Sequence, residues 1–206
     1  MWGAAICIKR SKTSNSFLKE TVLRIIGGKF KGRKLRPVQG TRTRPTSDRT
    51  REAIFNIIAS QVRNARVLDL FAGTGAMGLE ALSRGAQSAV FIDISRQSLS
   101  VLRENLAVLS LESTIRVIRW DLTQNLSCLH SMPRAFDLVF LDPPYNKNLI
   151  IPALDHLHRS QSMEDGARII VEHSQLEPVE PDALPFETVD RRRYGKTLVT
   201  FLNYVV

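Results

Sequence analysis

An aspartate, two prolines and a tyrosine follow an apolar run in the second half of the chain. The run ends at Leu141 and is followed by Asp142, Pro143, Pro144 and Tyr145. Two consecutive prolines cannot continue a strand or a helix, because each lacks a backbone N–H group and has a fixed φ angle. The chain must therefore leave the sheet in a rigid turn. That turn presents a carboxylate, backbone carbonyls and an aromatic face, which together could hold a flat heterocycle by its amino edge.

A glycine-rich loop forms a second cluster of residues that could do chemistry. The apolar run that starts at Val67 leads into Asp-Leu-Phe-Ala-Gly-Thr-Gly at 69–75, and a helical pattern follows. Glycines let the backbone approach a ligand closely, and the helix N-terminus attracts a negative group. Ligands of open parallel sheets lie beyond the carboxyl ends of the strands. We therefore predict a cofactor site formed by Asp69, Phe71, Ala72, Gly73, Thr74 and Gly75.

Two more acids follow predicted strands and extend this site. Asp93 comes twenty residues after Gly73, and its carboxylate can accept hydrogen bonds from both hydroxyls of a ribose. Its neighbour Ile94 is assigned to the same site. Asp121 follows a predicted strand and could meet an adenine amino group, although it could equally cap the segment that follows.

The glycine spacing leaves two cofactor classes open. Gly73-x-Gly75-x-x-Gly78 matches the dinucleotide fingerprint, which indicates an NAD-dependent oxidoreductase. However, Asp69 directly before the loop would repel a pyrophosphate and would favour a cation. S-adenosylmethionine fits better, because it has a ribose, a carboxylate, an ammonium and a sulfonium. Asp69 could also be a buried structural carboxylate with no ligand.

The basic residues are concentrated near the N-terminus. Residues 1–51 contain fourteen Lys and Arg against two acids, a net charge of +12, whereas the remainder carries −3. Such a basic arm on a nearly neutral body is typical of a protein that binds a polyanion, although a solvated tail would have the same composition. The candidate phosphate contacts are Arg33, Lys34, Arg36, Arg42 and Arg44.

The elements that would position these residues alternate along the chain. Ser47 caps a predicted helix, and strand and helix patterns alternate after residue 64, which predicts a parallel sheet with helices on both faces. A C-terminal hairpin at 186–204 completes the sheet. We predict a disordered extension at 1–22, a basic hairpin and connector at 23–46, and one main domain at 47–206. The predicted strands are Arg66–Phe71, Ala89–Asp93, Ile115–Trp120, Asp137–Leu141 and Ala167–Glu172, and the clearest helices are Met77–Arg84 and Arg96–Leu109.

Composition narrows the function classes further. No apolar run is long enough to span a membrane, and the basic residues at the N-terminus follow the apolar ones, the reverse of a secretory signal. The two cysteines, Cys7 and Cys128, have no disulfide or ligand spacing, and the four histidines form no metal pattern. We therefore expect a cytoplasmic protein with no metal and no membrane partner.

The chain resembles a known family once these motifs are taken in order. With the loop at 69–75, Asp93 and Asp-Pro-Pro-Tyr at 142–145, it resembles the class I S-adenosylmethionine-dependent methyltransferases. More narrowly it resembles the RsmD family, which methylates the exocyclic N2 of a guanine in 16S ribosomal RNA. The narrower match is carried by residues 24–28, 30–35 and 44–56. Family proteins begin near residue 24, so translation from Val22 or Leu23 is one hypothesis for the extra residues.

The resemblance implies a fold, a substrate and site residues. It implies a Rossmann-like, mostly parallel seven-stranded sheet, and 16S ribosomal RNA as substrate, either free or within an assembling 30S particle. It assigns the target amine to Asp142, Pro143, Pro144 and Tyr145. It also places Arg49 and Arg51 at the edge of the active site as RNA contacts, although solvation of a helix surface explains them equally well.

Several alternatives remain at this point. A DNA adenine or cytosine amino-methyltransferase shares the Asp-Pro-Pro-Tyr motif, but 206 residues leave little chain for a DNA-recognition domain. A non-catalytic RNA-binding assembly factor could keep the same fold. We expect a monomer. Transfer of a methyl group also requires that Asp142 and the Gly73–Gly75 bend lie on the same side of the molecule.

Overall fold

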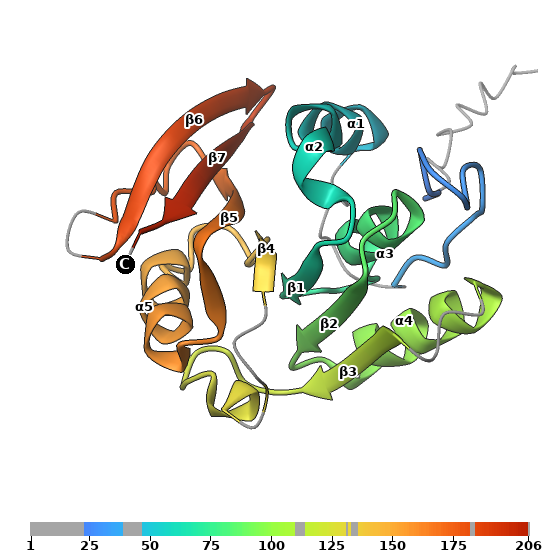
Figure 1. Ribbon diagram of the computed structural model, residues 1–206, viewed down its shortest axis with the longest axis horizontal. Coiled ribbons are helices and arrows are strands. Elements are labelled where there is room, and N and C mark those ends of the chain that lie inside the picture. The colour runs from blue at the N-terminus through green and yellow to red at the C-terminus, as the bar shows by residue number, and fades with distance from the viewer. Residues whose placement is uncertain are drawn as a thin grey trace, which may run out of the picture.

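The computed structural model describes residues 23–38, 47–109, 114–130, 132, 136–181 and 184–205. The extension at 1–22, the connector after residue 38 and the candidate residues Arg42 and Arg44 lie outside these ranges. Within them the chain forms a seven-stranded sheet in the order β3-β2-β1-β4-β5-β7-β6, which extends across the molecule from β3 at one end to β6 at the other (Figure 1). The strands are β1 Arg66–Leu70, β2 Ser88–Asp93, β3 Ile115–Arg119, β4 Phe136–Leu141, β5 Met163–Ser174, β6 Phe186–Tyr194 and β7 Thr197–Tyr204.

The sheet has the topology that the alternating pattern predicts. β1 to β5 pair in parallel, and β7 pairs antiparallel with both β5 and β6. The predicted α/β class, the mostly parallel sheet and the C-terminal antiparallel hairpin are confirmed. The boundaries of β1 to β4 differ from the predicted ones by one residue each. β5 differs most from the predicted strand Ala167–Glu172, because it begins at Met163, passes Gly166, which has a φ angle of +76°, and ends at Ser174.

Helices cover both faces of the sheet. One core cluster packs α1, α3, α4 and the N-terminal segment against one face, and a second packs α5 and the segment after β3 against the other. These two groups of helices lie on opposite sides of the sheet in Figure 1. The helices are α1 Asp48–Ile57, α2 Ala59–Val62, α3 Ala76–Ser83, α4 Arg96–Leu109 and α5 Ile150–Ser160, with a short 3₁₀ helix at Ser127–Leu129.

Helix α1 forms where its cap and its apolar spacing predict. The Ser47 hydroxyl accepts a hydrogen bond from the Thr50 amide at 3.1 Å, which satisfies one of the free N–H groups of the first turn. Ile54 and Phe55 have no exposed surface, and the Phe55 ring packs 5.6 Å from that of Phe140 on β4. The helix is thereby fixed against the strand that leads into Asp142.

The N-terminal segment folds back on itself and packs on the same core. The Ile25 amide donates to the Arg33 carbonyl and the Leu35 amide to the Leu23 carbonyl. The predicted hairpin contains an isolated bridge between Arg24 and Lys34 rather than paired strands, since its two arms are short. Leu23, Ile25 and Leu35 are buried, so the segment is anchored by apolar contacts as well as by its backbone.

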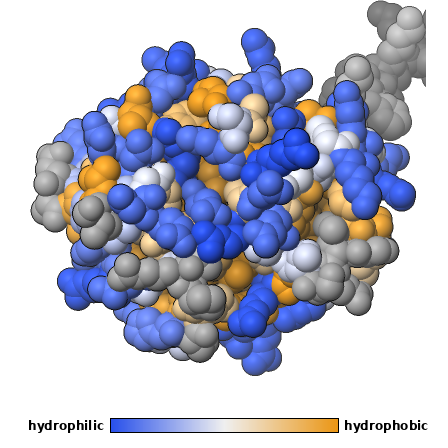
Figure 2. Space-filling model, viewed as in Figure 1, coloured by the Kyte–Doolittle hydropathy of each residue, from blue (hydrophilic) through white to orange (hydrophobic). Residues whose placement is uncertain are grey.

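On the face seen in Figure 2, hydrophilic residues predominate and the hydrophobic ones form small, interrupted patches. No helix within the described ranges is long and apolar enough to cross a membrane.

Candidate functional site

The two predicted motifs meet at one edge of the sheet. β1 lies between β2 and β4, and Leu70 is in register with Ile92 on one side and with Leu141 on the other. The residues that follow these three strand positions therefore leave the sheet together at its carboxyl edge. The glycine loop, Asp93 and Asp142 are accordingly on the same side of the molecule, as methyl transfer requires.

The glycine loop is held in a sharp turn that favours glycine. Gly73 and Gly75 have φ angles of +55° and +79°, in the left-handed region, and Gly75 caps the N-terminus of α3. A Cβ atom at Gly75 would lie 2.3 Å from the Leu102 side chain on α4. Phe71 also has a positive φ of +58°, which is unusual for an aromatic residue and marks a constrained backbone.

Asp93 fixes this loop directly. One of its carboxylate oxygens accepts from the Gly73 amide at 2.8 Å, and the other accepts from the Ser95 amide at 2.8 Å. A carboxylate has about four acceptor positions, so these two bonds leave capacity for ribose hydroxyls. Asp93 therefore sets the shape of the loop and remains available to a ligand.

Asp69 is a buried carboxylate beneath the loop. It is 3% exposed, and its Oδ2 accepts from the Gly78 amide at 2.9 Å. The pKa of Asp69 is raised to about 8, mainly by burial. This value includes a lowering by the hydrogen bond from Gly78 and a further rise caused by the charge of Asp93. A Cβ atom at Gly78 would lie 2.3 Å from the Phe91 ring, so the third glycine of the fingerprint is explained by packing.

The turn that follows β4 presents the predicted catalytic residues. Asp142 is partly buried, Pro143 is buried, and Pro144 and Tyr145 are exposed, with 39% of Tyr145 accessible. Burial raises the pKa of Asp142 well above its ordinary value, and the Glu172 and Asp69 carboxylates raise it further. The turn thus combines a carboxyl in a poorly solvated place with an accessible aromatic ring.

Tyr145 is held by side chains from the two neighbouring strands. Its hydroxyl donates to the Glu172 carboxylate on β5 at 2.8 Å and lies 3.1 Å from the Thr197 hydroxyl on β7. Burial, followed by the charge of Glu172, raises the pKa of Tyr145 above its ordinary value. The next amide, that of Asn146, donates to Glu177 at 2.6 Å. These bonds fix the orientation of the Tyr145 ring.

Asp121 and Ile94 lie beside the ends of β2 and β3. The Asp121 carboxylate accepts from the Thr123 amide, the Thr123 hydroxyl and the Gln124 side chain, and these hydrogen bonds lower the pKa of Asp121. The structure thus gives Asp121 the local capping role, while contact with an adenine stays a prediction. Ile94 is 53% exposed next to Asp93.

The predicted RNA contacts divide into exposed and buried residues. Arg33, Lys34, Arg36 and Arg49 are exposed, and Arg36 is paired with Glu104. Arg51 was assigned to RNA contact or to a solvated helix surface, and the structure contradicts both, because its side chain has no accessible surface.

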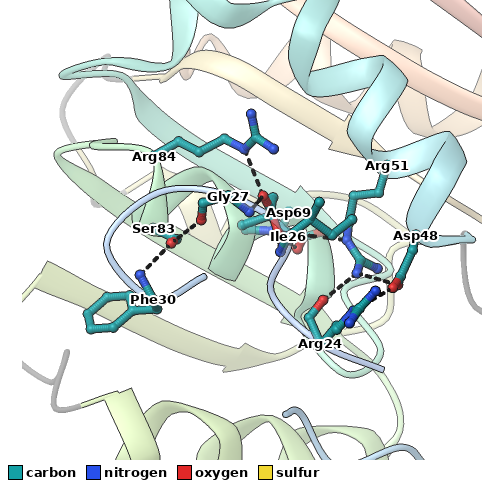
Figure 3. A network of polar contacts seen from close by, with 11 residues as sticks. Arg24, Ile26, Gly27, Phe30, Asp48, Arg51, Asp69, Ser83 and Arg84 are labelled. Carbon is teal, nitrogen blue, oxygen red and sulfur yellow. Dashed lines mark hydrogen bonds and ion pairs between the residues drawn. The ribbon is translucent and has the colours of Figure 1, made fainter. Parts of the chain in front are cut away.

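Arg51 instead belongs to a polar network that joins α1, α3 and the N-terminal segment (Figure 3). Its guanidinium donates to the Arg24 carbonyl and to Asp48, and it lies 3.9 Å from the buried Glu80 carboxylate. α1 thus presents this arginine to α3 and the N-terminal segment rather than to solvent. The charge count of the segment gave no sign of this.

Two side chains of the site were not assigned a role from the sequence. Glu172 ends the predicted strand Ala167–Glu172 but has no motif around it, and its bond to Tyr145 depends on the pairing of β4 with β5. Asn105 lies in the middle of α4, yet it is 2% exposed and donates to the Thr74 carbonyl of the glycine loop at 3.1 Å. A polar residue on the apolar face of α4 was the only signal available for Asn105.

No group of three or more His, Cys, Asp or Glu in the described part of the chain could hold a metal ion.

Comparison with known proteins gives matches that cover most of the chain. The family described as conserved hypothetical protein 95 matches residues 23–203. The putative rRNA methyltransferase YlbH of Bacillus subtilis is 38% identical over 153 residues, which cover 74% of this chain and 83% of that protein. The ribosomal RNA small subunit methyltransferase D of Escherichia coli K12 is 39% identical over 150 residues, covering 73% of this chain and 74% of that protein.

A solved structure agrees with these sequence matches. The putative methyltransferase yhhF from Escherichia coli superposes with a TM-score of 0.77 at 34% identity, covering 88% of this chain and 97% of that one. The shared fold is that of the class I methyltransferases. The chain therefore belongs to the conserved hypothetical protein 95 family, the RsmD family to which its motifs pointed.

Proposed function

We propose that this protein uses S-adenosylmethionine to methylate the exocyclic N2 amino group of a guanine in 16S ribosomal RNA. The observation that carries the proposal is the meeting of two sites at one sheet edge. The glycine loop after β1 and the Asp142–Tyr145 turn after β4 follow paired positions of adjacent parallel strands. The names of relatives that are 38 and 39% identical support ribosomal RNA as the substrate.

The donor set of the glycine-loop site fits S-adenosylmethionine. Asp93 would accept the ribose hydroxyls, and the free amides at the start of α3 would bind the carboxylate. Asp69 would favour the positive charge of the cofactor, because a buried carboxylate is stabilised in its ionised form by a nearby cation. The same carboxylate disfavours the pyrophosphate of NAD. When bound, S-adenosylmethionine supplies an electrophilic methyl group on its sulfonium.

The Asp142–Tyr145 turn would present the target amine. A guanine amino nitrogen shares its lone pair with the ring, so it is a poor nucleophile. Asp142 and the Pro143 carbonyl would accept its two N–H groups, which returns electron density to nitrogen and directs the lone pair. Tyr145 would stack on the base and fix its plane. Positioning and electrostatics of this kind supply several kcal/mol in other enzymes.

The base must also leave its stack to reach this turn. Removing a base from a helix costs roughly a few kcal/mol and costs least where the base is already unpaired. RNA readers favour such unstacked bases in loops and bulges. This favours a loop of ribosomal RNA over duplex DNA as the substrate.

Replacement of Asp142 tests the proposed chemistry. Asp142→Ala should lower methyl transfer to 16S ribosomal RNA by about 100-fold or more, since it removes the acceptor for the amine. Binding of RNA and of S-adenosylmethionine should persist. Transfer is measured with labelled cofactor, and the product is identified as N2-methylguanosine by mass spectrometry of nucleosides.

The control is Asp155→Ala on α5, whose carboxylate pairs with Arg159 alone among the residues that the structure describes. It should leave transfer unchanged. Full activity of Asp142→Ala would remove Asp142 from the mechanism. RNA binding without transfer by the unaltered protein would favour an assembly factor, and transfer to DNA adenine or cytosine would favour an amino-methyltransferase of DNA.

A further inference from the structure

The tip of the β6–β7 hairpin lies beside the turn that holds the target base. Thr197, the first residue of β7, has its hydroxyl 3.1 Å from that of Tyr145. Gln175, directly after β5, donates from its side chain to the Gly195 carbonyl at the tip at 3.0 Å. The hairpin is therefore fixed at the same sheet edge as the predicted catalytic residues, although it is more than forty residues later in the chain.

This tip is strongly basic and exposed. Arg191, Arg192, Arg193 and Lys196 are all exposed, and Asp190 is the only acid from 190 to 197. Arg192 pairs with Asp190 at 2.8 Å, and Arg191 donates to the Val179 carbonyl, so these two side chains already have partners. Arg193 uses its Nε to reach the Gly195 carbonyl, which leaves the rest of its guanidinium for a ligand.

The charge of the tip contrasts with that of the centre of the site. Asp69, Asp142 and Glu172 lie buried or partly buried at the ends of neighbouring strands. These acids suit the N–H groups of a base but repel a phosphate. The backbone on either side of a flipped nucleotide must therefore be held at the rim. Lys147, exposed two residues after Tyr145, adds a further positive charge to that rim.

We propose that Arg193 and Lys196, with Lys147, form a second phosphate-binding surface that holds the RNA backbone next to the target nucleotide. It would be distinct from the basic N-terminal segment, and it rests on the proposed function. Contacts of this kind add affinity and salt dependence but do not select the base. This surface would act on binding rather than on the chemical step.

The test compares two pairs of neutralised residues. Arg193→Gln with Lys196→Gln removes two charges from the tip, and Arg63→Gln with Arg116→Gln removes two charges from exposed sites outside it, at the end of α2 and on the edge strand β3. Binding of a labelled 16S ribosomal RNA transcript is measured across a series of KCl concentrations. Calorimetry with S-adenosylmethionine and a thermal melt verify that both proteins are intact.

The tip variant should bind RNA about tenfold more weakly at low salt, with a slope of log K against log [KCl] shallower by roughly 1.5, as expected for two lost phosphate contacts. Its transfer rate at saturating RNA should stay close to that of the unaltered protein. The Arg63 and Arg116 variant should change neither quantity appreciably.

If both double variants lose the same RNA affinity, the loss follows from the change in net charge and the proposal is overturned. RNA binding that is unaltered in the tip variant would also overturn it. These outcomes leave the proposed function intact if the unaltered protein still methylates RNA. If the unaltered protein neither binds nor methylates RNA, the proposed function and this surface fail together.

Discussion

At the scale of single residues, three acids on three neighbouring strands define the site. Asp69 lies on β1, Asp142 follows β4 and Glu172 lies on β5. Burial raises the pKa of both Asp69 and Asp142, and the charges of nearby acids raise it further: that of Asp93 at Asp69, and those of Glu172 and Asp69 at Asp142. Like charges are brought together at a cost in free energy, which a cationic ligand would offset. This is a physical reason to expect a sulfonium cofactor here rather than an anionic one.

The first prediction concerns the pH dependence of cofactor binding. The pKa of Asp69 is about 8, so at pH 6 this carboxyl is mostly protonated and the cation must displace a proton to bind. The affinity for S-adenosylmethionine should therefore rise from pH 6 to pH 8, with proton release on binding. Calorimetry in two buffers of different ionisation enthalpy measures both quantities.

Asp69→Asn should bind the cofactor more weakly and remove most of this pH dependence, since the amide can still accept from Gly78 but does not ionise. S-adenosylhomocysteine, which lacks the sulfonium charge, should show a weaker dependence. An affinity of the unaltered protein that is flat across this pH range would contradict the prediction.

The second prediction concerns Glu172, which we treat as a positioning residue for Tyr145. Glu172→Gln weakens the hydrogen bond from the Tyr145 hydroxyl, and Tyr145→Phe removes it. A bond to a charged group contributes about 1.5–3 kcal/mol to folding stability, so either change should lower the melting temperature by a few degrees. Transfer should fall by roughly tenfold or more, because the Tyr145 ring is no longer held in one orientation.

The two changes should not be additive, because both act on one contact. The double variant should therefore lose little more activity than Tyr145→Phe alone. Glu180→Gln, on an exposed residue after β5, is the matched control and should be additive with Tyr145→Phe. If the effects of Glu172→Gln and Tyr145→Phe on transfer are fully additive, Glu172 does not act through its hydrogen bond with Tyr145.

At the scale of elements, the strands could be predicted and the contacts between them could not. The runs Arg66–Phe71, Ala89–Asp93 and Asp137–Leu141 indicate strands, since apolar runs of that length bounded by turn residues are typical of parallel sheets. The order β1-β4-β5 is a property of the whole sheet, and it alone brings Glu172 to Tyr145. Arg51 is a second example of a contact between elements that the sequence does not predict. Its charge predicts a surface position, but it is buried against partners on other elements.

The third prediction concerns the network that attaches the N-terminal segment. The Glu80 carboxylate has no exposed surface and accepts from the Ile26 and Gly27 amides at 2.7 and 2.8 Å, as well as from Arg84. Glu80→Gln would leave Arg51 buried with less compensating charge. Removing one partner of a buried pair costs about 3–5 kcal/mol, so the urea midpoint should fall substantially.

Trypsin offers a local measurement of the same change. Cleavage in the Gly27–Lys34 stretch should become faster in Glu80→Gln, because this segment would detach before the sheet unfolds. Glu52→Gln, on the exposed side of α1, removes the same charge and should leave both the midpoint and the cleavage rate unchanged. Equal stability of the two variants would mean that apolar contacts alone hold the segment.

At the scale of the whole molecule, an acidic centre is combined with basic residues on the surface around it. The uneven charge of the sequence predicts a polyanion partner, and the glycine loop predicts a small-molecule site. Neither pattern indicates which residues connect the basic segment with the glycine-loop site. The connection is Asn105, whose Oδ1 accepts from the Arg36 amide at 2.7 Å and whose Nδ2 donates to the Arg36 and Thr74 carbonyls.

The last prediction is that this amide couples RNA binding to cofactor binding. Phosphate contact at Arg33, Lys34 or Arg36 would order the segment that Asn105 holds, and the same side chain supports the loop at Thr74. RNA should therefore tighten the binding of S-adenosylmethionine by about fivefold or more, and the cofactor should tighten RNA binding by the same factor, because coupling is reciprocal.

Asn105→Asp tests this coupling. The new carboxylate keeps the acceptor for the Arg36 amide but loses both donors, so the factor by which one ligand raises the affinity for the other should fall towards one. Asn56→Asp, an exposed change on α1, should retain it. Coupling that survives in Asn105→Asp would show that the two sites communicate elsewhere, whereas its absence in the unaltered protein would show that they bind independently.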